Sequence, residues 1–340
     1  MKIAHLHVWD KKNKGDLGIV LAVQQLLKKY LAPVEIIDLP IEVLRDGQIK
    51  NFKKINQTDL VVIGGGGIYY RWFLPFDPKK ISQIKPPIVI FGPGYIREIG
   101  SPPLAEKEVE SIVCLNRKAV LSSVRDYQTK KFLLQAGVKA KKIQVIGDPA
   151  IFLAEAKPIK IPKSNLPKIG LNLNYSGWLG FGRYEKDIIR SYNQIGNYFQ
   201  KKHQAEIYYF QHHPDEKRIR PKLQIPRLNL IDYPVKQQKY IYGKMDLVIG
   251  MMLHSAVLAF GAQTPEINVA YDLRNRSFAE FIGCPELVIS AKKLNGSALL
   301  NKAKLIFNKR IQYRNKFKLR KEKIWQKHLL FLEKIKKIQK

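Results

Sequence analysis

Cysteine is scarce, because only Cys114 and Cys284 occur among the 340 residues of the chain. Two cysteines cannot form a disulfide framework, and their separation matches no metal-ligand spacing. No run approaches the roughly 18 apolar residues that cross a bilayer. The first ten residues contain His5, His7 and Asp10, which makes them too polar for the core of a signal peptide. We therefore expect a globular protein of a reducing, cytoplasmic compartment.

Acidic residues are also few, with 28 Asp and Glu against 60 Lys and Arg, a net charge of +32. Such an excess indicates anionic partners: phosphorylated metabolites, an anionic membrane face or nucleic acid. An AT-rich genome that favours lysine explains the same excess without any binding role. Between Lys302 and Lys340 the chain has 15 Lys and Arg and two Glu, so a net +13 falls in this tail.

Apolar residues form 45% of the chain, which is enough to fill hydrophobic cores. The length favours two domains of roughly 100–200 residues each. Short β-branched runs alternate with helical patterns, which predicts parallel sheets covered by helices on both faces. The expected strands are 2–8, 34–39, 60–63, 87–91, 119–122 and 144–146, then 168–173, 206–211, 228–231, 246–249 and 266–270. The expected helices are 16–30, 126–135, 184–202 and 255–260.

The stretch 157–168 (KPIKIPKSNLPK) is rich in proline and has no period, so it predicts a domain boundary. We expect an N-terminal Rossmann-like domain at 1–160, a second at 165–292 and a basic helical tail at 293–340. The fold class is α/β, with two Rossmann-like domains facing each other across a cleft. Ligands of such sheets bind beyond the carboxyl ends of the strands.

The tail has a single long helical pattern from about Leu294, with an apolar stripe and many lysines. One interpretation is a helix that packs back on both domains. The other is an amphipathic helix of 302–340 that lies on the inner, anionic face of the cell membrane.

Two glycine-containing segments follow expected strands. Gly15 and Asp16 lie between the first strand and the first helix, where glycine permits a tight turn and Asp16 can cap the helix or contact a ligand. Gly64, Gly65, Gly66 and Gly67 follow 60–63 and expose backbone N–H groups, as phosphate-binding loops do. Neither segment has the GxGxxG or P-loop pattern. A flexible turn is the alternative interpretation of the four glycines.

Charged residues follow two other strands. Arg125 offers a planar set of donors suited to a carboxylate or phosphate, and Asp126 is placed to begin the next helix. An Arg125–Asp126 ion pair is an equally good interpretation. Asp272 and Arg274 follow 266–270 and add a carboxylate and a cation at the same edge.

Histidines occur at two further strand ends. His254 opens the helix after 246–249, where an imidazole can transfer protons beside an anionic ligand, and Ser255 is a candidate cap. His212 and His213 follow 206–211 and are candidates for acceptor or phosphate contacts. No third ligand is spaced with them, so we expect no metal site.

Several ordered segments together resemble the polysaccharide pyruvyl transferase family. They cover about residues 3 to 285 and read NKGDLGI, DLVVIGGGGIYY, IVIFGPGYI, SSVRDYQTKKFLLQAGV, VIGDPAIFL and DLVIGMMLHSAVLAFGAQTPEINVAYDLRNRSFAEFIG. The resemblance implies two domains arranged as in glycosyltransferase-B enzymes. It also implies phosphoenolpyruvate as donor substrate, with no cofactor, and a sugar diol of a cell-surface polysaccharide or lipid-linked glycan as acceptor. The product would be a pyruvyl ketal.

The resemblance also assigns site residues. His254 matches the histidine of the family's Arg-Leu-His motif and is assigned general acid/base work, with Asp16 as the second catalytic residue. Together with the positions at strand ends described above, the candidate substrate-binding residues are Gly15, Gly64, Gly65, Gly66, Gly67, Arg125, Asn174, His212, His213, Ser255, Asp272 and Arg274.

Two positions differ from the family pattern. Met252 stands where the motif has arginine, and Asn174 stands where members commonly have an arginine after the strand that opens the second domain. Three explanations stay open: Arg183, Arg276 or a lysine substitutes; the donor is another molecule; or the chain has lost phosphoenolpyruvate chemistry.

Two rival functions are considered. The first is a nucleotide-sugar-dependent glycosyltransferase of the same architecture. The second is a nucleic-acid-binding protein that relies on the positive charge, but the sequence shows no recognised nucleic-acid module, so no specific nucleic acid is expected.

Overall fold

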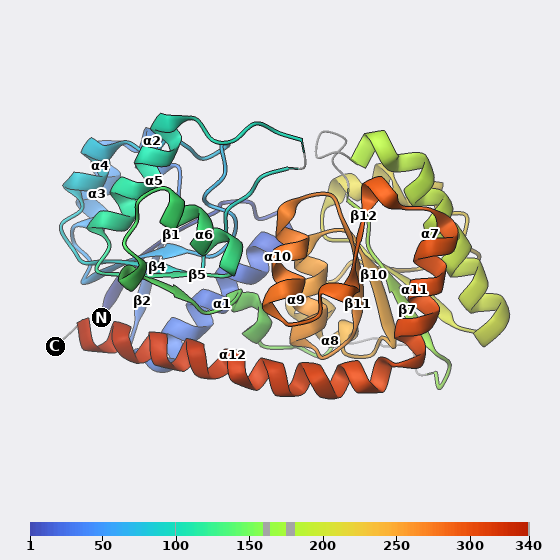
Figure 1. Ribbon diagram of the computed structural model, residues 1–340. Coiled ribbons are helices and arrows are strands. Elements are labelled where there is room, and N and C mark those ends of the chain that lie inside the picture. The colour runs from blue at the N-terminus through green and yellow to red at the C-terminus, as the bar shows by residue number, and fades with distance from the viewer. Residues whose placement is uncertain (99, 159–163, 175–180, 339–340) are drawn as a thin grey trace. The chain divides into compact units, whose positions relative to one another are not determined.

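A computed structural model describes residues 1–98, 100–158, 164–174 and 181–338 of the chain. Contacts between residues group the chain into two compact units. The segments of each unit can be found in Figure 1 by their colour, which follows the residue number. Unit 1 comprises Met1–Lys11, Ile19–Leu153 and Lys323–Lys340, and unit 2 comprises Lys12–Gly18 and Ala154–Glu322. The expected boundary at 157–168 includes 159–163, which lie outside the described residues, so the expected domain limits stay a prediction.

Unit 1 is built on a six-stranded parallel sheet with the order β2-β1-β3-β4-β5-β6. The strands are β1 (Lys2–His7), β2 (Glu35–Pro40), β3 (Leu60–Gly64), β4 (Ile88–Phe91), β5 (Leu121–Val124) and β6 (Ile143–Val145). The strand order reverses between β1 and β3, which makes the carboxyl ends of these two strands a preferred place for ligands.

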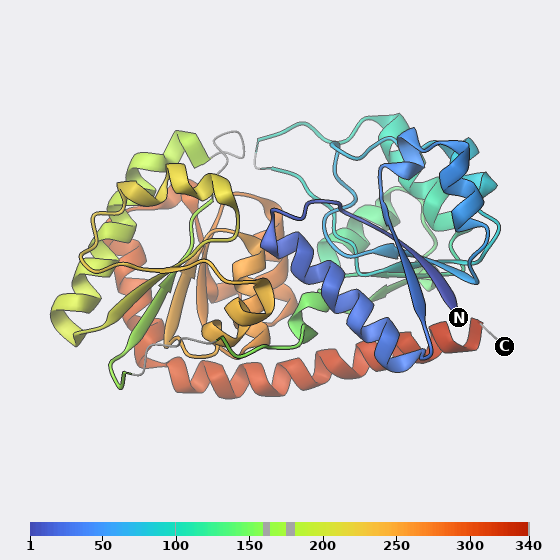
Figure 2. The same cartoon turned by 180° about the vertical axis from the view of Figure 1, so that it is seen from behind.

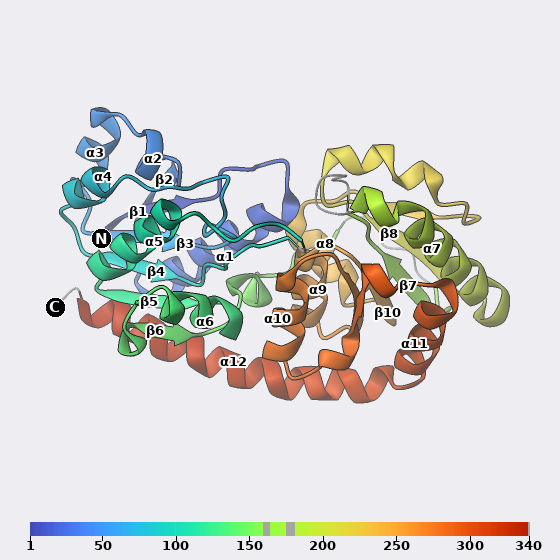
Figure 3. The ribbon, with the colours of Figure 1, turned by 45° about the horizontal axis from the view of Figure 1, so that its top comes forward.

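Helices cover both faces of this sheet, and each face has its own hydrophobic cluster. One face carries α2 (Val43–Asp46), α3 (Ile49–Ile55), α4 (Pro78–Gln83), α5 (Glu106–Lys118) and α6 (Tyr127–Gln135). The other carries α1 (Lys14–Tyr30) from Ile19 onward and the end of α12 (Arg310–Ile338), as Figures 2 and 3 show. Because both faces are buried, the central strands are continuous apolar runs.

Unit 2 has a second six-stranded parallel sheet, with the order β12-β11-β10-β7-β8-β9. Its strands are β7 (Lys168–Leu171), β8 (Glu206–Phe210), β9 (Asn229–Ile231), β10 (Leu247–Gly250), β11 (Glu266–Ala270) and β12 (Val288–Ser290). Helices α7 (Phe181–His203) and α11 (Gly296–Asn308) lie side by side on one face, as Figures 1 and 3 show. Helices α8 (Val235–Tyr242), α9 (Leu253–Gly261) and α10 (Leu273–Phe281) cover the other.

The C-terminal tail forms two helices instead of the single helical run expected from its pattern. Lys309 ends α11, and the Arg310 guanidinium donates to the carbonyl oxygen of Phe307 (3.0 Å) and to Asp246 Oδ1 (3.1 Å). A cation bound to the last carbonyls of a helix stabilises its end, which explains a break without glycine or proline. The part of α12 up to Glu322 belongs to unit 2 and the part from Lys323 to unit 1.

The expected α/β class with two Rossmann-like domains is confirmed, because each unit is a parallel sheet with helices on both faces. Among the helices of the described residues, none has both the length and the apolarity that crossing a bilayer requires.

Candidate functional site

The strand order of unit 2 reverses between the neighbouring strands β7 and β10. Ligands of open α/β sheets bind beyond the carboxyl ends of the strands at such a reversal. Asn172 and Asn174 follow β7, and the segment 251–254 follows β10. The candidate site is therefore built around these two strand ends.

Asn172 fixes the two strand ends to each other. Its side chain is buried, its Oδ1 accepts from the N–H of Met252 (3.2 Å) and its Nδ2 donates to the carbonyl of Phe210 (3.0 Å). Its carbonyl oxygen accepts from the N–H of Met251 (3.1 Å). A buried amide with these partners holds the start of α9 rigidly on the sheet.

His254 lies in the first turn of α9 and packs on the backbone of Gly15. Its exposure is 7%, so the imidazole is mostly shielded from solvent. A Cβ atom on Gly15 would lie 1.8 Å from Nδ1 of His254, so only glycine permits this packing. His254 Nε2 lies 3.6 Å from Asp16 Oδ1. The structure thus brings together the three residues predicted from two distant segments.

The segment that contains Gly15 and Asp16 is anchored on the end of β8. The N–H of Lys14 donates to the carbonyl of His212 (2.9 Å), and Lys14 Nζ donates to the carbonyl of Gln211 (3.0 Å) and pairs with Asp232. Asp16 was expected as a possible cap of α1, but that role belongs to Asn13.

The cap position is explained by its hydrogen bonds. Asn13 Oδ1 accepts from the N–H of Gly15 (3.0 Å) and of Asp16 (3.4 Å). A short amide before the first helical residue satisfies these N–H groups, which releases the Asp16 carboxylate to point toward His254.

Arg274 supplies a cation in the same cluster. Asp272 is fully buried, and its Oδ2 accepts from Arg274 Nε (2.7 Å) while its Oδ1 accepts from the Arg274 N–H (2.8 Å) as the cap of α10. Burial by itself lowers the pKa of Arg274, but Asp272, Tyr271 and Asp16 together raise it above its ordinary value. The guanidinium is therefore permanently charged, and Asp16 interacts with both Arg274 and His254.

Ser255 does not cap α9 as expected, because Met252 is the residue before the helix and makes no side-chain cap. Ser255 is fully buried and its Oγ donates to Glu266 Oε2 (2.8 Å). Tyr242 O–H donates to Ser255 Oγ (3.0 Å) and lies 2.8 Å from His212 Nε2. The side chains of His212, Tyr242, Ser255 and Glu266 thus form a buried chain of polar contacts that includes the residue after His254.

The two histidines predicted after β8 both have hydrogen-bond partners within unit 2. His212 is fully buried, and burial, with a smaller contribution from Lys14, lowers its pKa to about 3. His213 Nδ1 accepts from the N–H of Asp215 (3.1 Å) and caps the short helix Pro214–Arg218. A ligand role for either stays a prediction.

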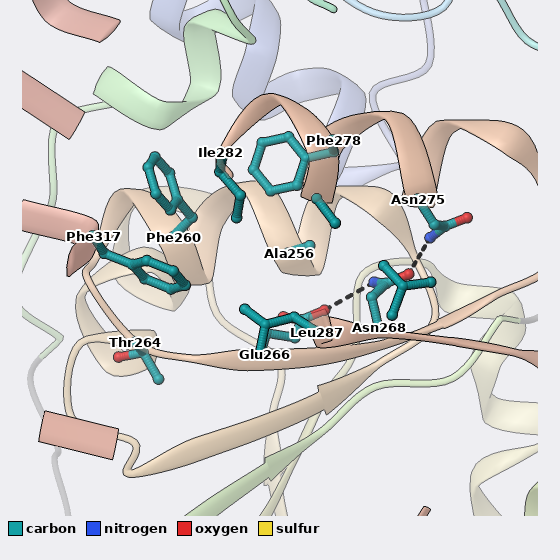
Figure 4. A pocket seen from close by; sticks show the side chains of 12 residues that line it. Ala256, Phe260, Thr264, Glu266, Asn268, Asn275, Phe278, Ile282, Leu287 and Phe317 are labelled. Atoms are coloured by element: carbon teal, nitrogen blue, oxygen red, sulfur yellow. Dashed lines mark hydrogen bonds between the residues drawn. The ribbon is translucent and has the colours of Figure 1, made fainter. Parts of the chain in front are cut away.

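A cavity behind α9 is lined by α10, β11 and the Phe317 ring, as Figure 4 shows. Its volume of about 20 Å³ holds one water molecule and is too small for a sugar. Asn275 donates to Asn268 and Asn268 donates to Glu266 at its polar end. The cavity therefore belongs to the interior of unit 2, not to a substrate site.

In unit 1 the four glycines that end and follow β3 are all buried. A Cβ atom would lie 2.2 Å from the Phe91 carbonyl at Gly64 and 2.0 Å from Ile96 Cδ1 at Gly67, and Gly65 has φ +81°. Close packing by itself therefore requires glycine at these positions. Phosphate binding by Gly64, Gly65, Gly66 and Gly67 stays a prediction.

Arg125 forms the ion pair that was its alternative interpretation. It is 4% exposed, with Nε 3.4 Å from Asp126 Oδ2 and Nη1 3.6 Å from Asp148 Oδ2. Asp126 also caps α6, as predicted, by accepting from the N–H of Thr129 (2.7 Å). Burial raises the pKa of Asp148 although Arg125 opposes the rise. Within the described residues, Nε and Nη2 of Arg125 have no hydrogen-bond partner.

The positions that differ from the family pattern are both neutral and buried, with Met252 5% and Asn174 1% exposed. Arg276, named as a substitute cation, is exposed and lines a hollow with Glu280 and Ser290, whereas Arg274 bonds to Asp272. The side chain of Arg183, the other named arginine, lies outside the described residues.

Sequence reasoning missed three residues that build the site: Asn13, Lys14 and Asn172. An Asn followed by Lys-Gly-Asp before an apolar periodic run is a cap signal, so Asn13 could have been found. Lys14 and Asn172 act through carbonyl groups of distant strand ends, and no local pattern indicates such partners.

Two parallel sheets of Rossmann type, each with helices on both faces, define a protein of the glycosyltransferase-B-like class. The chain belongs to the polysaccharide pyruvyl transferase family, whose sequence model matches residues 13–272. The suspected family is thereby confirmed. A comparison with curated proteins gives no significant sequence match.

Solved structures share the fold at low sequence identity. Anabaena HepE in complex with UDP-glucose is 15% identical, with 98% of this chain and 99% of that chain covered and a TM-score of 0.61. A proposed UDP-N-acetylglucosamine 2-epimerase of Listeria monocytogenes is 14% identical, with coverage of 93% and 90% and a TM-score of 0.63. S. aureus MnaA with UDP is 13% identical, with the same coverage and a TM-score of 0.61.

Proposed function

We propose that the chain transfers the pyruvyl group of phosphoenolpyruvate to two hydroxyls of a sugar in a polysaccharide or lipid-linked glycan. Family membership supports a transferase that modifies glycans. The observation that carries the proposal is the His254–Asp16 pair, held on Gly15 at the strand reversal of unit 2. An imidazole, a carboxylate and a cation are the groups that the reaction needs.

The reaction adds two C–O bonds and breaks one. A proton is added to the methylene carbon of the enol, and one sugar hydroxyl attacks the neighbouring carbon, to which the phosphate is bound. The second hydroxyl then displaces phosphate and closes the ketal. The two hydroxyls release two protons. One returns to the acid that gave its proton to the methylene carbon, and the other leaves with inorganic phosphate.

His254 and Asp16 divide the proton transfers. Protonated His254 supplies the proton for the methylene carbon, and Asp16 accepts a proton from an attacking hydroxyl. Arg274 is charged throughout and stabilises the carboxylate or phosphate of the donor. Asp272 holds the guanidinium in place through two hydrogen bonds, so Asp272 acts as a positioning residue.

The test is phosphate release from phosphoenolpyruvate in the presence of a glycan acceptor. His254→Asn and Asp16→Asn are each expected to lower kcat by about 10²–10⁴-fold, as the loss of a general acid or base does. The matched control is His203→Asn. His203 is the last residue of α7, just before β8 begins, so it lies away from the carboxyl ends of the strands. Unchanged phosphate release in His254→Asn would remove this histidine from the mechanism.

Gly15→Ala tests the packing itself. The added methyl group would overlap the imidazole, with 1.8 Å to Nδ1, and must displace it. A shift of about 1 Å at a reacting group costs on the order of 10²-fold in rate, so a loss of that size is expected. Gly243→Ala is the control, since its added Cβ meets nothing closer than 3.2 Å. Equal activity of the two variants would contradict the proposed geometry.

The alternative function is a nucleotide-sugar-dependent glycosyltransferase of the same architecture, or a family member without phosphoenolpyruvate chemistry. The neutral side chains of Met252 and Asn174 favour it, because they place no charge where family arginines would meet a trianionic donor. Thermal-shift titrations with phosphoenolpyruvate and with UDP-sugars separate the two. Stabilisation by phosphoenolpyruvate supports the proposal, and stabilisation by the UDP-sugar only would replace it with the alternative.

A further inference from the structure

Three potential metal ligands lie together on one face of the unit 1 sheet, outside the site described above. His5 and His7 alternate along β1, so both side chains point to the same face. Asp38 of β2 is the register partner of His5 and shares that face. Their nearest ligand atoms all lie within 4.8 Å of one another.

His5 has one ring nitrogen without a hydrogen bond in the described part of the chain. Its Nε2 lies 3.2 Å from the carbonyl oxygen of Gly64, which can only accept a hydrogen bond, so Nε2 carries the proton. The lone pair of the neutral ring is then on Nδ1. Nδ1 is buried and has no hydrogen-bond partner in the part of the chain that the structure describes, and His5 is fully buried.

His7 has an acceptor at each ring nitrogen. Nδ1 lies 2.9 Å from the carbonyl oxygen of Val8, and Nε2 lies 3.1 Å from Asp38 Oδ1. A neutral imidazole has only one N–H, which the carbonyl takes. The Nε2 lone pair would then face a carboxylate oxygen, an arrangement that is stable only when a cation or a second ring proton lies between them.

We infer that Nδ1 of His5, Nε2 of His7 and the Asp38 carboxylate bind one divalent metal ion of the Zn²⁺ class. Two imidazoles and a carboxylate are ligands that zinc accepts, and three protein ligands leave a fourth position for water or a ligand oxygen. The Asp38 side chain is 43% exposed, so the fourth position is reached from solvent.

The surrounding contacts match those of bound metals. Metal-binding histidines donate their second ring N–H to a carbonyl or carboxylate, which fixes the tautomer. His5 and His7 donate in this way to Gly64 and Val8. Gln24 of α1 donates from Nε2 to Asp38 Oδ1 and orients the carboxylate.

The experiment is a titration of metal-free protein, without a histidine tag, with Co²⁺ followed by visible absorption. We expect one Co²⁺ per chain, with the intense d–d bands of four-coordinate geometry, and displacement by one equivalent of Zn²⁺. His7→Gln and Asp38→Asn are each expected to weaken Co²⁺ binding by at least about 100-fold, since even outer contacts of a metal site are worth 10–100-fold. His203→Gln and Asp46→Asn are matched controls away from the cluster, and both should bind as the unaltered chain does.

If His7→Gln does not fold, Asp38→Asn still decides the test, because the Asp38 side chain is partly exposed. Circular dichroism establishes that Asp38→Asn is folded before its titration. The inference is overturned if the unaltered chain binds no Co²⁺, or if binding persists in Asp38→Asn. It is also overturned if ¹⁵N NMR of the Zn²⁺-treated protein shows protons on both ring nitrogens of His7 at neutral pH, because the second proton would then occupy the place assigned to the metal. None of these readouts requires transferase activity.

Discussion

Glu266 is an acidic residue in an environment that its type does not predict, because it is buried in unit 2. It begins β11, is 5% exposed and accepts hydrogen bonds from Ser255 and Asn268. Burial raises its pKa from 4.5 to about 8, although both hydrogen bonds oppose the rise. Between these two values the folded chain keeps a proton that the unfolded chain releases, so stability falls as pH rises through this range.

Glu266→Gln removes this titration while keeping the shape of the neutral acid. Relative to the variant, the unaltered chain is expected to lose roughly 1 kcal/mol of unfolding free energy per pH unit between about pH 5 and pH 8. Urea unfolding across this range measures the difference. The control is Glu110→Gln, at an exposed position of α5. Parallel stability curves for the unaltered chain and Glu266→Gln would contradict the buried, protonated state.

At the scale of elements, the apolar stripe of α12 has buried residues in each of the two units. Phe317 is buried in unit 2, and Phe331, Leu332 and Ile335 are buried in unit 1. The Phe331 ring lies 5.3 Å from that of Phe91, centroid to centroid. These residues of the stripe are used for packing inside the protein, and lysine is the most frequent residue type among the exposed positions of α12 that the structure describes.

Neighbouring residues of α12 provide a matched stability test. Phe331→Ala removes a fully buried ring and is expected to cost about 3–5 kcal/mol of unfolding free energy. Leu330→Ala changes a side chain that is 57% exposed and should stay within about 0.5 kcal/mol. Urea unfolding followed by tryptophan fluorescence reports the change, since Trp325 packs against the same cluster. Equal effects of the two substitutions would show that the end of α12 does not pack on unit 1.

Elements were predictable where one local pattern decides them. The buried strands 60–63 and 266–270 match β3 and β11 closely, because hydrophobic runs bounded by glycine or polar residues leave few alternatives. Site contacts were less predictable. The packing of His254 on Gly15 joins two segments far apart in the chain, and the ends of helices depended on partners such as Asn13 and Arg310 that only the folded chain supplies.

At the scale of the whole molecule, the net charge of +32 is the dominant feature. Much of it lies in the tail, where α12 exposes Lys316, Lys318, Lys323 and Lys334. Exposed charges attract any polyanion, and the attraction falls with salt. The charge therefore supports contact with anionic membrane lipids or phosphorylated substrates without specifying a nucleic-acid sequence.

We predict that the chain binds vesicles containing phosphatidylserine and binds duplex DNA, both only at low salt. Two unrelated DNA sequences should bind within about twofold of each other, and affinity should fall at least about tenfold between about 50 and 200 mM salt. Sedimentation with vesicles and fluorescence anisotropy with DNA measure these effects, with phosphatidylcholine vesicles as the uncharged control. A preference for one DNA sequence would show that specific nucleic-acid recognition had been missed.

The grouping of segments has a consequence for any attempt to obtain half of the protein. Unit 1 is assembled from three stretches of chain and unit 2 from two. A gene fragment that stops at residue 153 would omit Phe331 and its neighbours, which complete a hydrophobic cluster of unit 1. A fragment of 154–322 would omit Gly15, on which His254 packs. Dividing the chain at one position therefore leaves neither unit complete. Exchanging unit 2 between relatives would also require exchanging the first turn of α1, which belongs to unit 2.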